Sequence, residues 1–165
     1  MVKITMKTLT GLTTLFVLML SPGWADGLSL TIGAPVAAQG QNMSGPPYPM
    51  SKRASFVFRL NGCADNPGAQ ITARAEGIVA GSRVSVPLNP STAQASGVFG
   101  IAPQWGNQGK WVVAITATCK GEITGAIVAV EGYDFKRDSS RLLSHAPTQA
   151  EIEADLKAWN EAPAQ

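Results

Sequence analysis

The stretch Gly97–Cys119, GVFGIAPQWGNQGKWVVAITATC, decides the fold of this chain. It predicts two β-strands joined by a turn, because glycine and asparagine gather between two segments rich in β-branched and aromatic residues. In the second segment, alternate residues from Trp111 to Cys119 are apolar and would share one face of a strand. The face that buries Trp111 therefore directs Cys119 inward, and we expect this strand to lie in the middle of a sheet.

Four more segments predict strands, at residues 55–60, 70–76, 83–88 and 123–131. The first three alternate as a strand with one buried face does, and the small inward residues of the second indicate close packing against a large side chain such as Trp111 or Phe99. Pro87 cannot donate to a ladder, so its strand lies or ends at an edge.

The segment 123–131 is apolar on both faces, which requires a central position or a cover supplied by the C-terminal segment. Short strands with turns every 8–12 residues and no helical period between them are typical of an antiparallel sandwich. We therefore predict an all-β fold, an antiparallel β-sandwich of six or seven strands over residues 54–132, followed by one short helix.

Cys63 and Cys119 are the only cysteines. A metal pair or a reactive thiol lacks support, because no C-x-x-C motif and no nearby histidine accompany them. We predict a structural disulfide between them, and closing so long a loop would stabilise the fold by roughly 4 kcal/mol in the chain-entropy model.

The N-terminus has the pattern of a secretory signal peptide over residues 1–25: two lysines, an apolar run over Leu9–Leu20, and small residues up to Ala25. The run is short for a membrane span, and cleavage after Ala38 is the alternative. Residues 26–53 are rich in Gly, Pro and Ser and predict a linker, in which Leu28–Ile32 could add a short strand if cleavage follows Ala25.

Two of the 13 basic residues lie in the signal peptide, which leaves 11 against 11 acidic residues. A neutral chain without a basic stripe does not favour nucleic-acid binding. The cluster Lys136–Arg141 is interrupted by Asp138 and is interpreted as a solvated connection. We expect a periplasmic or secreted protein with no membrane span after signal removal.

A C-terminal extension over residues 133–165 should contain a helix at about 149–159. Thr148 and Glu151 form a capping box, and the stripe Ile152, Leu156 and Trp159 follows on one helix face. An isolated helix of this length is marginal, so it either packs on the sandwich or offers its stripe to a partner.

A search for chemistry finds no catalytic, metal or cofactor site. The single histidine, His145, follows Ser144, and either Asp134 or Asp138 could complete a hydrolytic set, but no Gly-x-Ser-x-Gly elbow is present. The glycines lie in turns rather than ahead of helices, as a phosphate loop would require. We expect no enzyme and no cofactor, with a hydrolase built on an unrecognised site as an alternative.

Trp105 is the candidate binding residue, because it lies at the expected turn beside Asn107 and Gln108. An aromatic ring flanked by amides suits stacking on a sugar or anchoring a protein contact. Strand parity favours the other interpretation, in which Trp105 folds back to cap one end of the core.

Gly97-Val98-Phe99 followed by Gly109-Lys110-Trp111-Val112-Val113 resembles the Gly-x-Phe … Gly-x-Trp-x-Val pattern of bacterial immunoglobulin-like and transthyretin-like domains, among them the carboxypeptidase regulatory-like modules. The resemblance covers roughly residues 54–131 and implies a non-enzymatic sandwich that binds, spaces or assembles. The antibody type fits less well, because Ala117 stands where its tyrosine corner would place Tyr.

The sequence thus favours a non-catalytic module of the cell envelope that binds another envelope protein or a surface ligand. A carbohydrate-binding domain using Trp105 is the second hypothesis.

Overall fold

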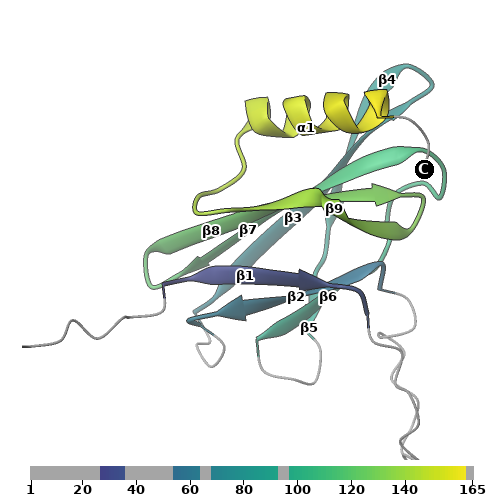
Figure 1. Ribbon diagram of the computed structural model, residues 1–165. Helices are drawn as coiled ribbons and strands as arrows, with labels where there is room; N and C mark the ends of the chain where they lie inside the picture. The colour runs from purple at the N-terminus through teal and green to yellow at the C-terminus, as the bar shows by residue number, and fades with distance from the viewer. Residues whose placement is uncertain (1–26, 36–53, 64–67, 93–96, 163–165) are drawn as a thin grey trace, which may run out of the picture.

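The computed structural model describes residues 27–35, 54–63, 68–92 and 97–162. The predicted signal peptide and most of the predicted linker lie outside the described residues. The described chain forms two antiparallel sheets with one helix outside them (Figure 1), which confirms the predicted sandwich architecture.

The four-stranded sheet has the order β1 (Ser29–Gly33), β2 (Phe56–Asn61), β6 (Val98–Ile101), β5 (Ser91–Thr92). The five-stranded sheet has the order β4 (Ser82–Leu88), β3 (Gln70–Val79), β7 (Lys110–Cys119), β8 (Glu122–Glu131), β9 (Asp134–Leu143). The described residues therefore hold nine strands rather than six or seven, although β5 has only two residues. As expected, β7 lies mid-sheet and β4, which contains Pro87, lies at an edge.

The prediction that Gly97–Cys119 forms a hairpin is wrong. Its two strands lie in different sheets: β6 pairs with β2 and β5, whereas β7 pairs with β3 and β8. The connection between them carries the chain across the core, and Trp105 anchors it by donating from Nε1 to the carbonyl oxygen of Gly132 at 2.8 Å. Burial of a large ring in this connection outweighs the local turn preference of the glycine and asparagine that follow it.

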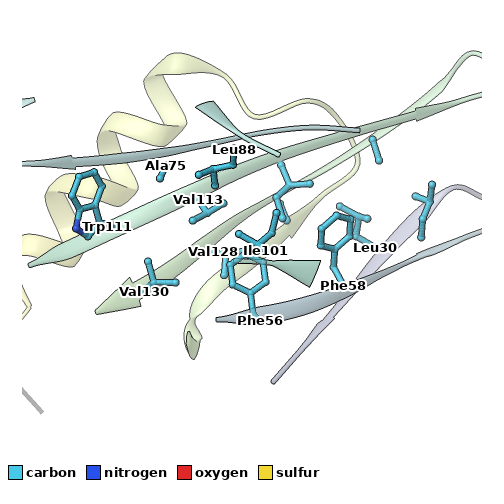
Figure 2. Close-up of a cluster of buried hydrophobic side chains, with 14 of the residues drawn as sticks. Leu30, Phe56, Phe58, Ala75, Leu88, Ile101, Trp111, Val113, Val128 and Val130 are labelled. Carbon is cyan, nitrogen blue, oxygen red and sulfur yellow. The ribbon is translucent and has the colours of Figure 1, made fainter. Parts of the chain in front are cut away.

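The core lies between the sheets, where Phe56 and Phe58 of β2 face valines of β7 and β8 (Figure 2). The large neighbour expected for β3 is Trp111, which pairs with Gly77. A Cβ atom at Gly77 would lie 2.3 Å from the Trp111 ring, so only glycine leaves room for it. The predicted disulfide is present: Cys63 follows β2 in one sheet and Cys119 ends β7 in the other, so the bond joins the two sheets.

Two predicted boundaries need correction, because the sandwich extends beyond residues 54–132 at both ends. Within the predicted linker, Ser29–Gly33 forms β1 and buries Leu30. Within the predicted C-terminal extension, Asp134–Leu143 forms β9, which pairs with β8. The first is the short strand that the alternation over Leu28–Ile32 had allowed. The second, β9, lies at a sheet edge, where exposed polar residues hide the apolar alternation of a strand.

The helix α1 (Gln149–Glu161) begins with the predicted capping box of Thr148 and Glu151 and covers the outer face of the five-stranded sheet (Figure 1). Its buried stripe packs on the outward residues of β7 and β8. These contacts are Ile152, Leu156 and Trp159 against Val112, Ala114, Ile127 and Ala129. The helix therefore packs on the sandwich and does not offer its stripe to a partner, which explains why both faces of β8 are apolar.

Candidate functional site

The three candidate ligand residues, Trp105, Asn107 and Gln108, differ in their exposure to solvent. Trp105 is 5% exposed and belongs to the core cluster, whereas Asn107 and Gln108 are exposed beside it. The Gln108 carbonyl oxygen accepts a hydrogen bond from Trp111 Nε1 at 3.0 Å. Because a ring that stacks on a sugar must present its face to solvent, the buried Trp105 caps the core, and the carbohydrate hypothesis loses the residue on which it rested.

The imagined hydrolytic set does not assemble among the described residues. His145 is exposed; its Nε2 atom lies 3.6 Å from Glu151 Oε1, and its Nδ1 atom lies 2.9 Å from the Ala146 carbonyl oxygen. No hydrogen bond joins His145 to Ser144, Asp134 or Asp138. In the part of the chain that the structure describes, no group of three His, Cys, Asp or Glu residues could hold a metal ion, and no helix there is long and apolar enough to cross a membrane.

The pairing of β9 with β8 contains a β-bulge, which draws attention to another part of the surface. Ile127 of β8 pairs with Arg141, but Ala129 pairs with Lys136, so four residues of β9 stand opposite one residue of β8. Ser140 stabilises this bulge, since its hydroxyl donates to the Lys136 carbonyl oxygen at 2.7 Å and accepts from the Ala129 amide at 2.9 Å. Bulges of this kind re-aim side chains and are common beside functional sites.

Beside the bulge, β1 and β9 leave a groove of about 270 Å³, which we call the β1–β9 groove. Its apolar surface comes from Ile32, Phe135 and Leu142, and its polar surface from Thr31, Arg137, Ser140 and Arg141.

Leu142 pairs with Ala126, whose side chain lies in the core, so Leu142 has the strand parity of a core residue. It is nevertheless 55% exposed, because β1 and β9 belong to different sheets and do not close this side of the sandwich completely. The groove is thus an opening toward the core along one edge, with a leucine left at its surface.

The two arginines of the groove differ in their partners. Arg141 is held by α1, with Nε 2.7 Å from Asp155 Oδ2 and Nη1 3.6 Å from Glu151 Oε1. Arg137 is exposed, its guanidinium lies against Gly33 of β1, and no hydrogen bond or ion pair joins it to another described residue. The groove therefore combines an apolar surface with one positive charge that the described fold does not neutralise.

The charged residues between α1 and the sheet differ from Arg137, because they are paired with one another. The buried Glu76 accepts hydrogen bonds from Arg83 at 3.0 Å and Ser85 at 2.9 Å, and Arg83 also binds Glu153 at 2.6 Å. The hydrogen bond with Glu153 raises the pKa of Arg83. Hydrogen bonds from Gln149 and then Arg83 lower the pKa of Glu153. These interactions hold the helix on the sheet.

A second depression, of about 370 Å³, lies between α1 and the β3–β4 hairpin. Its charged residues are already paired, Arg83 with Glu153 and Lys157 with Glu161. It therefore offers no unsatisfied charge to a ligand, and the β1–β9 groove is the stronger candidate.

Sequence reasoning missed the groove because one of its two walls is β9, a strand that the sequence did not indicate. The segment Asp134–Leu143 shows apolar residues only near its ends, and the four-residue bulge breaks the period-two pattern between them.

No family model, curated protein or solved structure matches the chain.

Proposed function

We propose that this protein is a non-catalytic binding module of the cell envelope, periplasmic or secreted, and that it binds another envelope protein through the β1–β9 groove. The observation that carries the proposal is Leu142, a residue of core parity that is 55% exposed beside the unpaired Arg137. Exposed apolar surface rimmed by polar residues is typical of interaction sites, and arginine is enriched in protein interfaces.

Export is supported by the signal-peptide pattern and by the disulfide, because such bonds persist in oxidising compartments. A binding role rather than catalysis is also what the resemblance to bacterial immunoglobulin-like and transthyretin-like domains implies. A sandwich hosts many functions, so the groove and not the fold is the basis of this proposal.

Site-specific photo-crosslinking in the cells that produce the protein tests it. A photoreactive residue at Leu142 should give one adduct of defined mass. Ile123 is the matched control, since it is also apolar and 47% exposed but lies outside the groove. Equal adducts at both positions, or none at Leu142, would contradict binding through the groove, and a turnover found in an activity screen would contradict the non-catalytic role.

A further inference from the structure

We infer that the partner inserts one apolar side chain into the β1–β9 groove and places an adjacent carboxylate on Arg137. This inference rests on the proposed function and specifies the chemistry of the segment that the groove recognises.

The openness of the groove favours a side chain of a larger partner over a free small molecule. Small-molecule sites bury most of the ligand surface in pockets of roughly 300–1,000 Å³. The groove measures about 270 Å³, and Thr31, Arg137 and Leu142 at its rim are exposed. A protein surface around the inserted side chain would cover this rim and exclude water from it, as the periphery of an interface does.

The apolar half of the recognition comes from Ile32, Phe135 and Leu142. Ile32 and Phe135 are partly buried against the core cluster, and Phe135 also contacts Phe56 with ring centroids 5.8 Å apart. These two residues are therefore fixed, and they form a preorganised floor. An aliphatic side chain fits such a floor better than a polar one.

The charged part of the proposed recognition site is Arg137. Arg141 is neutralised by Asp155 and Glu151, and Lys136 lies 3.4 Å from Glu131. The Ser140 hydroxyl is used within the bulge. Arg137 is thus the charged lining residue whose donors are unengaged by other described residues, and a guanidinium pairs most strongly with a planar carboxylate.

The bulge argues against a partner that simply extends the five-stranded sheet. Adding a strand requires a regular row of backbone groups along the edge, and residues 137–140 interrupt that row in β9. Bulges and edge charges are common protections against such pairing. Recognition at the β9 edge therefore depends on side chains.

Nuclear magnetic resonance with two matched peptides tests the inference on the protein as isolated from the cells that produce it. The probes are acetyl-Gly-Leu-Asp-Gly-amide and the same peptide with Asn in place of Asp. We expect amide shifts confined to β1 and β9, and binding of the Asp peptide about tenfold tighter, the size expected for a hydrogen bond to a charged group. Arg137→Gln should abolish this preference.

Arg59→Gln is the matched control, because Arg59 is an exposed arginine of β2 outside the groove and has no hydrogen bond or ion pair with another described residue. It should keep the tenfold preference. Equal binding of the two peptides, a preference retained in Arg137→Gln, or shifts outside the groove would overturn the inference. If the adduct at Leu142 forms and the peptides do not differ, the proposed function stands and this inference fails; without the adduct, the proposed function itself fails.

Discussion

The outer face of the five-stranded sheet and the β1–β9 groove are both apolar surfaces bordered by arginines, but only the first is covered by a described element of the chain. On that face, α1 covers Val112 and Ile127, and each of them is 1% exposed. In the groove, Leu142 remains 55% exposed. Two arginines, Arg83 and Arg141, bind carboxylates of α1, whereas Arg137 of the groove binds no described residue.

The two regions differ in whether an element of the chain packs on their apolar residues. Where the chain supplies the cover, apolar residues are buried and arginines find carboxylates. The groove also combines apolar residues with arginines, but no described element covers it. We therefore propose that a partner binds there. Variants that affect one region or both test this difference, and the Cys63–Cys119 disulfide supports both.

The largest effect is expected from removing the disulfide. Replacing Cys63 and Cys119 together with alanine should lower the free energy of unfolding by about 4 kcal/mol, because a long loop of the unfolded chain is no longer closed. The bond joins the two sheets, so it supports the covered face and the groove alike. Urea denaturation measures the loss, and a change below about 1 kcal/mol would contradict a structural role.

Truncation on the covered face should come next. Ile152→Ala removes a fully buried side chain and should cost about 3 kcal/mol, as for other large-to-small changes in a core. Lys157→Ala is the control, since Lys157 is exposed on the same helix. If both variants unfold at the same urea concentration, the helix does not form a second core with the sheet.

The buried charge beneath the helix should contribute less. Glu76→Gln keeps the size of the side chain but weakens its ion pairs with Arg83 at 3.0 Å and Arg74 at 3.3 Å. We expect a loss of about 2 kcal/mol in the free energy of unfolding, because hydrogen bonds to a charged group are the stronger kind. Glu161→Gln, at the exposed end of α1, should change stability little, and an equal loss in both variants would contradict this assignment.

Acid should weaken the covered face before it affects the groove. Hydrogen bonds from Thr148 lower the pKa of Glu151, and hydrogen bonds from Gln149 and Arg83 lower the pKa of Glu153, each from an ordinary value of 4.5. A carboxylate whose folded pKa is lowered contributes stability above its unfolded pKa and loses it as pH falls through the folded pKa. The melting temperature should therefore decline below about pH 4.5, and the double variant Glu151→Gln, Glu153→Gln should show a shallower decline. An unchanged pH profile in that variant would contradict the prediction.

The sequence predicted the features that depend on strong local patterns. The alternation from Trp111 to Cys119 identified a central strand, the two apolar faces of 123–131 required a cover, and Thr148 with Glu151 identified the start of α1. Each of these elements has a buried face or a cap that leaves a regular residue pattern. The disulfide followed from the presence of only two cysteines.

The features that the sequence did not predict depend on contacts distant in the chain. Whether residues 98–101 pair with 110–119 or cross to the other sheet depends on the contact of Trp105 with Gly132, which local turn preferences do not encode. β9 was missed because an edge strand pairs with a neighbour on one side only, and it therefore tolerates polar residues and a bulge. The candidate site lies between β1 and β9, so missing β9 also concealed the groove.

The smallest effect should come from the groove itself, and it separates the two regions most directly. Leu142→Ala should change the free energy of unfolding by less than about 0.5 kcal/mol, because an exposed side chain contributes little to the folded state. The same substitution should remove an apolar rim contact of the groove for the Leu side chain of the probe peptide, and so weaken peptide binding severalfold. Urea denaturation and the peptide titration give the two values on one sample. A loss of stability near that of Ile152→Ala would place Leu142 in the core and contradict the distinction between a surface covered by the chain and one that a partner covers.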